Sequence, residues 1–141
     1  MSGPIDTSTE FGQRLQKSLS AQETIWLTTV NSAGVPNPSI VWFLWEDDSI
    51  YILSQPHQIK VKSIAANPQV ALHFDSDGHG GIMQVINGTA TLLEPATVET
   101  VPATYFSKYE QGLKGLGYSH QDMVTGYSQP IRITIDKVRG H

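Results

Sequence analysis

The feature that most constrains the fold is a succession of β-rich segments separated only by short turn sequences. The first three such segments are rich in β-branched and aromatic residues and span Thr24–Val30, Val35–Trp45 and Ser49–Ser54. The sequences Asn31–Gly34 and Asp47-Asp48, which separate them, are typical of turns. Tight turns join antiparallel neighbours, whereas parallel strands need a long crossover. The pattern therefore predicts an antiparallel meander and argues against a Rossmann-type nucleotide fold.

Three later segments extend this sheet, namely Val70–Asp75, Ile82–Leu93 with a bend at Gly88, and Ile131–Val138. Six strands joined by short connections favour a small antiparallel barrel. We therefore predict a mainly β fold, a six-stranded antiparallel barrel with a few flanking helices. One domain over residues 9–141 follows a flexible tail, residues 1–8. Pro36 and Pro38 cannot donate to a ladder, so the start of the second strand is expected to be irregular or at an edge.

Helical patterns are confined to the margins of this sheet. Phe11, Leu15 and Leu19 recur every four residues, and Ser8 or Thr9 is suited to cap that helix. Further helices are expected over Gln58–Ala66, after Pro56, and more weakly over Val98–Tyr109 and Gln121–Tyr127. The glycine-rich Gly112–Gly117 lacks the preceding strand that a phosphate loop requires, so we interpret it as an ordinary loop.

Charge and composition exclude several classes of protein. The 141 residues hold 9 Lys and Arg against 13 Asp and Glu, and the net charge of −4 argues against a nucleic-acid-binding domain. Cysteine is absent, which rules out disulfides, thiolate catalysis and cysteine-based metal sites. The longest apolar run, Ile40–Trp45, is far too short for a membrane span, and Met1–Glu10 lacks an apolar signal core. We therefore expect a cytoplasmic protein with no membrane partner.

The segment Ser54–Lys62 is the most informative candidate for a functional site. A strand ends in a hydroxyl residue, Pro56 opens a helix, and Lys60 follows about one turn later. A helix N-terminus offers free N–H groups and partial positive charge, so a hydroxyl and a lysine beside it suit a phosphate. Such loops are common, and the residues by themselves favour an ordinary strand–loop–helix with solvated lysines.

Other candidates carry less information. The five histidines show no metal-binding spacing, and we predict no metal site. The loop Asp75–Gly81 lacks the terminal Glu of a calcium loop, so a flexible hairpin or a ligand-covering loop is favoured. Trp26, Trp42 and Trp45 lie in predicted strands and are most simply core or interface aromatics, although one of them beside a planar ligand stays open.

Several motifs in order resemble one known superfamily. They are WLTTV at 26–30, G-x-P-x-P at 34–38, VWFLW at 41–45, S-x-P-x-x-x-K-V at 54–61, I-x-x-N-P-x-V-x-L-x-F at 64–74 and G-T-A at 88–90. Their order and spacing resemble the pyridoxamine-phosphate-oxidase-like split-barrel superfamily. The subgroup that they resemble most uses the deazaflavin coenzyme F-420.

This resemblance implies a split barrel that forms a homodimer, with a cofactor at the dimer interface and redox chemistry on a small organic substrate. It assigns the cofactor phosphate to Ser54 and Lys60 and a contact with the flavin ring to Gln84. Lys62 is a further candidate for the anionic tail of F-420. The strand that runs along the ring would contribute Pro38, Ser39, Ile40, Val41 and Trp42.

One departure from the superfamily pattern bears on the reaction. True pyridoxamine-phosphate oxidases carry Arg-Lys where this chain has Ile59-Lys60, so one phosphate-binding arginine is missing and vitamin B6 oxidation is disfavoured. The resemblance implies an FMN- or F-420-dependent oxidoreductase in which the cofactor performs the chemistry and no side chain is catalytic. Two alternatives remain: a non-catalytic flavin or haem binding or storage protein, and a dimeric structural domain with a vestigial pocket.

Overall fold

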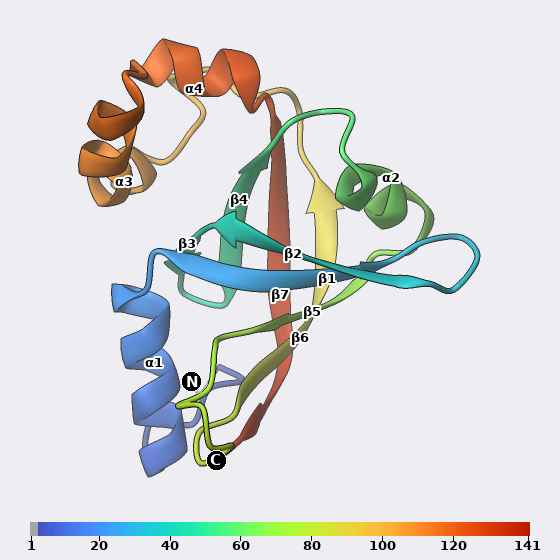
Figure 1. Ribbon diagram of the computed structural model, residues 1–141, viewed down its shortest axis with the longest axis vertical. Coiled ribbons are helices and arrows are strands. Elements are labelled where there is room, and N and C mark those ends of the chain that lie inside the picture. The colour runs from blue at the N-terminus through green and yellow to red at the C-terminus, as the bar shows by residue number, and fades with distance from the viewer. Residues whose placement is uncertain (1–2) are drawn as a thin grey trace.

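The structure is a computed structural model that describes residues 3–141, so Met1 and Ser2 of the predicted tail lie outside the described residues. Seven strands form one antiparallel sheet in the described part of the chain, in the order β2-β1-β5-β6-β7-β4-β3. The sheet is strongly curled, and the helices lie around its margins (Figure 1). Its strands are β1 Thr24–Val30, β2 Pro36–Trp42, β3 Leu44–Glu46, β4 Ser49–Ser54, β5 Gln69–His73, β6 Gln84–Leu92 and β7 Gln129–Gly140. The mainly β, antiparallel barrel class is confirmed.

The second predicted strand, Val35–Trp45, is two strands in the structure, which is why there are seven and not six. Phe43 interrupts it between β2 and β3. These two strands occupy the opposite edges of the sheet, so the chain passes from one edge to the other at Phe43. Pro36 and Pro38 lie in β2, which pairs only with β1 among the described strands, as expected for an edge.

Four helices are present in residues 3–141: α1 Glu10–Ala21, α2 Ile59–Ala66, α3 Ala103–Leu116 and α4 His120–Gly126. Thr9 caps α1, because its hydroxyl accepts from the N–H of Gly12 at 2.9 Å. A capping box of Ser119 and Asp122 begins α4. The loop predicted for Gly112–Gly117 is wrong, because α3 continues through it to Leu116 and is capped by Gly117, whose φ is 72°. No helix in this part of the chain has the length and apolar character needed to cross a membrane.

β4 separates two hydrophobic cores. Ile50 and Ile52 face the interior of the curled sheet, whereas Tyr51 and Leu53 face a second core formed with α3 and α4. Successive side chains of a strand point to opposite faces, so a strand buried on both faces must have an apolar partner on each. The second core holds the α3–α4 segment against the outside of β4 and so builds one wall of the cavity described next.

The main core fills the interior of the curled sheet. It is closed by Leu15 and Leu19 of α1 and by Val61 and Ile64 of α2. The bend predicted at Gly88 is present as a register shift between Asn87 and Gly88 where β6 pairs with β7. This bulge helps the long strands to curl around the core.

Candidate functional site

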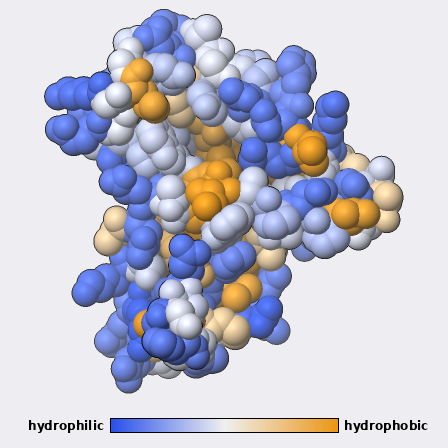
Figure 2. All heavy atoms as spheres, viewed as in Figure 1, coloured by the Kyte–Doolittle hydropathy of each residue, from blue (hydrophilic) through white to orange (hydrophobic). Residues whose placement is uncertain are grey.

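A cavity of about 340 Å³ lies between the ends of β2 and β4, the start of α2 and the α3–α4 segment. In Figure 2 apolar surface gathers in the hollow between the upper helices and the central strands. The cavity has a polar end near α2 and an aromatic end near α3. Its lining comprises Ile40, Val41, Trp42, Leu53, Ser54, Gln55, Gln58, Lys60, Tyr105, Leu116, Tyr118, Met123 and Tyr127.

The polar end is built from the connection between β4 and α2. Ser54 ends β4 and is buried, and its hydroxyl donates to the carbonyl of Gln55 at 2.9 Å. Gln58 is the N-cap of α2 but caps it with no side-chain hydrogen bond; its amide instead donates to Oε1 of Gln55 at 2.6 Å. The first backbone N–H groups of a helix have no intrahelical acceptor, so α2 presents uncapped donors and the positive end of its dipole beside the cavity.

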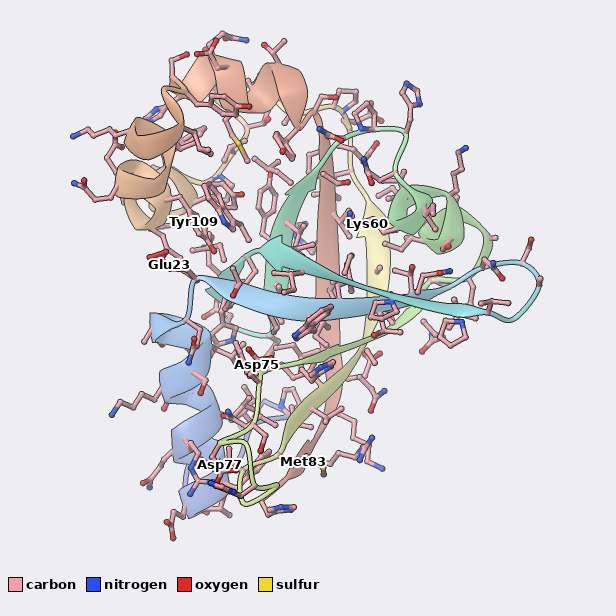
Figure 3. The ribbon with its side chains drawn as sticks, viewed as in Figure 1. Glu23, Lys60, Asp75, Asp77, Met83 and Tyr109 are labelled. Carbon is pink, nitrogen blue, oxygen red and sulfur yellow. The ribbon has the colours of Figure 1, made fainter. Side chains whose placement is uncertain are left out.

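Lys60 supplies the cationic group at this end. It is half-buried on α2, on the side toward the strands in Figure 3, and desolvation lowers the pKa of its ammonium group. The ion pairs among residues 3–141 are Glu10–Arg14 and Glu110–His120, so no described carboxylate neutralises Lys60. A partly desolvated cation without a counter-ion is well suited to bind an anion. Lys62 is exposed and lies outside the cavity lining.

The last residues of β2 form the wall between the two ends. Ile40, Val41 and Trp42 all line the cavity, and Ile40 is 54% exposed at the edge of the sheet. Their predicted contact with a cofactor ring stays a prediction. Pro38 and Ser39 lie earlier on the same strand and do not line the cavity of this chain. The assignment of these two residues to a cofactor therefore stays a prediction.

Trp42 is held in place by α3. Its ring stacks on that of Tyr109, with centroids 4.4 Å apart and an interplanar angle of 3°. A β-carbon at Gly112 would lie 3.1 Å from Cη2 of Trp42, so the helix needs a small residue there for the indole to fit. The two contacts fix the orientation of an aromatic ring in the cavity wall.

The same tyrosine satisfies the backbone where β2 and β3 part. Its hydroxyl accepts from the backbone N–H of Phe43 at 2.7 Å. The carbonyl oxygens of Glu23 and Phe43 lie 2.6 and 2.8 Å from the same hydroxyl. The Nζ of Lys108 donates to the Phe43 carbonyl at 2.9 Å and lies 3.7 Å above the Phe43 ring. Burial lowers the pKa of Lys108 to about 8. Tyr109 and Glu23 lie side by side in Figure 3.

For the aromatic end the sequence predicted only that the region Tyr105–Tyr127 could cover the substrate side, and no side chain there was singled out. Tyr105, Met123 and Tyr127 line it from the α3–α4 segment. Tyr105 is fully buried, and its hydroxyl has no hydrogen-bond partner among the described residues. The four-residue spacing of Tyr105 and Tyr109 on a helix was the one available signal, because it places both rings on the same face.

Gln84 lies outside this cavity. It begins β6, is buried, and its Oε1 has no hydrogen-bond partner in the part of the chain that the structure describes. It pairs in register with Gly140 near the end of β7, toward the opposite end of the sheet from α4. A contact between Gln84 and a cofactor in the cavity of the same chain is therefore absent, and the predicted role of Gln84 stays a prediction that needs a second copy.

The remaining candidates form no site of their own. No group of three or more metal-binding side chains occurs among residues 3–141. Asp77 organises the loop after β5 by accepting from the N–H groups of His79 and Gly81. Trp26 donates from Nε1 to Asp75 at 3.0 Å and stacks on His73, outside the cavity. Trp42 is thus the one tryptophan that lines the cavity.

Several proteins of known structure share this architecture. An F420 reductase has a TM-score of 0.69 at 16% identity, over 88% of this chain and 94% of that one. The haem storage protein HutZ from Vibrio cholerae has 0.65 at 14%, over 93% and 94%. A FAD-binding protein from Mesorhizobium loti has 0.66 at 20%, over 91% and 90%. These identities show a shared fold alone.

At the level of sequence, no protein with a curated description matches the chain. The family model described as pyridoxamine 5'-phosphate oxidase matches residues 11–141, which is nearly the whole chain and includes every element that builds the cavity. The chain therefore belongs to the pyridoxamine 5'-phosphate oxidase family.

Proposed function

We propose that the cavity holds the phosphate-bearing part of F-420 or FMN, and that the protein transfers hydride between this cofactor and a small organic substrate. One observation carries the proposal. Ser54, the uncapped start of α2 and the unpaired Lys60 converge at one end of a single cavity. A hydroxyl, free backbone N–H groups and a cation are the donors that a phosphate requires.

The wall formed by Val41 and Trp42 supports a planar ligand beside that phosphate. Trp42 presents an aromatic ring that is already fixed by Tyr109, so little side-chain freedom is lost when a flat ring packs against it. The cavity thus combines an anion site for the phosphate with an apolar slot for the planar ring of a flavin or deazaflavin.

A homodimer is part of the proposal. Val35 and Ile40 near the free edge of β2 and Ile59 on α2 are 50%, 54% and 62% exposed. Large apolar side chains exposed along this edge and on α2 favour coverage by a second copy. Since neither Gln84 nor Lys62 lines the cavity of its own chain, any contact of these residues with the cofactor would have to come from the second copy.

Vitamin B6 oxidation is not part of the proposal. Lys60 is the one Lys or Arg in the cavity lining, and Ile59, where the resemblance expects arginine, is exposed and does not line the cavity. Similarity to an F420 reductase supports the deazaflavin, and similarity to a FAD-binding protein supports flavins in general. We favour F-420, with FMN as the close alternative.

The residues of this chain would bind and orient, and none needs to act as a nucleophile. When bound, a reduced flavin or deazaflavin supplies the hydride. Lys60 would pair with the phosphate, Ser54 would turn its hydroxyl from the Gln55 carbonyl to a phosphate oxygen, and Trp42 would limit movement of the ring. Leu53 and Met123 would help to exclude water from the reacting face.

A comparative titration of the full chain with F-420, FMN and haemin tests the proposal. We expect micromolar or tighter binding of F-420 or FMN, followed in stopped-flow mixing by faster oxidation of the reduced complex by a quinone than of the free cofactor. Binding without faster oxidation would favour a storage protein. The absence of binding by both redox cofactors would refute the proposal.

Haem is kept as an arm of this test because HutZ shares the fold. Haem iron takes an axial ligand such as His, Met or Tyr. The cavity lining holds no histidine, so a haem there would have to use Met123 or a tyrosine. Tight haemin binding with no binding of F-420 or FMN would therefore replace the proposed cofactor.

A further inference from the structure

A second hollow, separate from the proposed cofactor cavity, lies against the first half of β4. It is an open groove of about 410 Å³ between the β3–β4 turn, β7 and the start of α3. Ser49, Tyr51 and Leu53 alternate on the outer face of β4, so this face borders the groove at its start and the cavity at its end. The groove shares no lining residue with the cavity; its lining comprises Glu46, Asp47, Asp48, Ser49, Tyr51, Pro102, Arg132 and Thr134.

Tyr51 brings an unused hydroxyl to this groove. Only 6% of the residue is exposed, and its ring packs edge-on against Tyr105. The hydroxyl makes no hydrogen bond with residues 3–141, yet it is not among their enclosed unpartnered atoms, so its tip is open to solvent. In register Tyr51 lies opposite Arg132 of β7, and residues paired in this way share one face of a sheet. The open tip therefore lies on the side of the sheet where the groove is.

Arg132 supplies a cation beside that hydroxyl. Burial raises the pKa of Tyr51, and the Arg132 guanidinium is close enough to oppose the rise; the hydroxyl stays protonated and can donate. Arg132 is exposed and belongs to no ion pair among residues 3–141. The uncapped start of α3 lies at the same groove, because its N-cap, Pro102, is part of the lining. A guanidinium, a phenol and the free N–H groups of a helix start are donors suited to a carboxylate.

The opposite rim of the groove is acidic. Glu46 and Asp47 are exposed at the β3–β4 turn and belong to no ion pair in the described part of the chain, whereas the carboxylate of Asp48 lies against Gly3. Glu46 is on the same face as Arg132 but two strands away, a backbone separation of about 10 Å. A simple anion would meet the carboxylates and a simple cation would meet Arg132, so a ligand with both charges at opposite ends fits this groove best.

We propose that the groove binds a short zwitterion, with its carboxylate at Arg132 and Tyr51 and its ammonium group at Glu46 and Asp47. An ω-amino acid and a dipeptide share this chemistry. The site has no residue in common with the cofactor cavity, so the inference goes beyond the proposed function and does not depend on it.

A matched series of small molecules tests the proposal. δ-Aminovalerate carries both charges, whereas valerate and pentylamine have the same chain length and carry one charge each. Binding to the full chain at neutral pH is followed by two-dimensional NMR titration. δ-Aminovalerate should bind with a dissociation constant of about 1 mM or tighter. Each singly charged analogue should bind at least about 10-fold more weakly, the scale of one hydrogen bond to a charged group.

Glycylglycine in the same titration distinguishes the two sources of the ligand. Tighter binding of glycylglycine than of δ-aminovalerate would identify a dipeptide site, and weaker binding would identify a site for an ω-amino acid. Either result supports the proposal, because both molecules carry an ammonium group and a carboxylate at opposite ends.

Arg132→Gln should weaken δ-aminovalerate binding about 10-fold or more and leave pentylamine unchanged. Arg139→Gln is the matched control, because it removes an exposed arginine from the same strand outside the groove and changes the net charge equally. It should alter δ-aminovalerate binding much less. Tyr51→Phe should weaken δ-aminovalerate roughly 3- to 10-fold. It should melt no lower than the wild-type chain, since the hydroxyl has no partner within the described protein to lose.

Four results would overturn the proposal. They are the absence of binding of both zwitterions at about 10 mM, equal affinity for δ-aminovalerate and one of its singly charged analogues, equal losses in Arg132→Gln and Arg139→Gln, and unchanged δ-aminovalerate binding in Tyr51→Phe. Competition between δ-aminovalerate and FMN would also reject it, because the zwitterion would then occupy the cofactor cavity. Failure of FMN binding with intact δ-aminovalerate binding would instead reject the proposed function alone.

Discussion

Replacing Lys60 by alanine is the sharpest test of the anion site. Lys60 has no carboxylate partner in the described structure, so its removal leaves no buried charge unpaired. The change should therefore act on the ligand and leave the free chain intact. Desolvation lowers the pKa of Lys60, which means that the fold disfavours its charged form, and Lys60→Ala should unfold at a urea concentration no lower than the wild-type chain.

The size of the expected loss follows from the type of contact. A hydrogen bond to a charged group contributes about 1.5–3 kcal/mol, which corresponds to roughly 10- to 150-fold in the dissociation constant. FMN affinity is measured by fluorescence titration at about 0.15 M salt, where charges more than about 8 Å apart are largely screened. Riboflavin is the matched ligand, because it has the same ring and lacks the phosphate. Lys60→Ala should weaken FMN and leave riboflavin unchanged.

Lys62→Ala makes the same change in net charge two residues along the same helix, on an exposed side chain outside the cavity. We expect it to weaken FMN binding much less than Lys60→Ala. An equal loss for the two variants would show that only overall charge matters. An equal loss for FMN and riboflavin would show that Lys60 does not contact the phosphate, and the reasoning about the cavity would be refuted.

Three further predictions concern the stability of the fold. Tyr109→Phe keeps the ring but leaves the buried N–H of Phe43 without an acceptor, and should lower the free energy of unfolding by about 2–3 kcal/mol in urea titration; a loss below about 0.5 kcal/mol would contradict this role. Because the pKa of Lys108 is about 8 in the fold and 10.5 when unfolded, stability should rise with pH across that interval, and Lys108→Met should flatten the rise in unfolding curves. Gly88→Ala would place a β-carbon 2.6 Å from the carbonyl oxygen of Thr134 and should cost about 1–3 kcal/mol of stability, whereas unaltered urea unfolding would show that the bulge tolerates a side chain.

The strands were predictable where local signals were complete. The segment Ser49–Ser54 lies between an aspartate turn and Pro56, and β4 has the expected bounds. The interruption at Phe43 was not predictable, because it depends on a hydroxyl from Tyr109, 66 residues away in the sequence. Local propensity in Val35–Trp45 favours one continuous strand, and only the tertiary contact stabilises the free backbone groups at the break.

The candidate site, too, was easiest to predict where its residues are close together in the sequence. Its polar end is local in sequence, since one short segment carries Ser54, the start of α2 and Lys60. The residues alone favoured an ordinary strand–loop–helix there, and the phosphate site was predicted only with the resemblance. The resemblance added Val41 and Trp42 of the wall. The aromatic end comes from α3 and α4, whose side chains reach the cavity only because Tyr51 and Leu53 bury the outer face of β4 against them. The unbroken apolar run Ile50–Leu53 is consistent with burial of β4 on both faces, but it does not show which segment covers the second face.

The glycines of α3 show why a local interpretation failed at the residues that shape the site. A glycine in a helix interior costs about 1 kcal/mol relative to alanine, so a glycine-rich stretch favours a loop. Gly112 lies within α3 nonetheless, and a β-carbon there would press on the indole of Trp42. The helix therefore accepts the cost of that glycine because the contact allows Trp42 to lie flat on Tyr109, whose hydroxyl in turn bonds the backbone at Phe43. Two segments far apart in sequence, Trp42-Phe43 and Tyr109–Gly112, thus fix one aromatic ring in the cavity wall. The glycine within α3 marks the place where packing around that ring outweighs helix propensity.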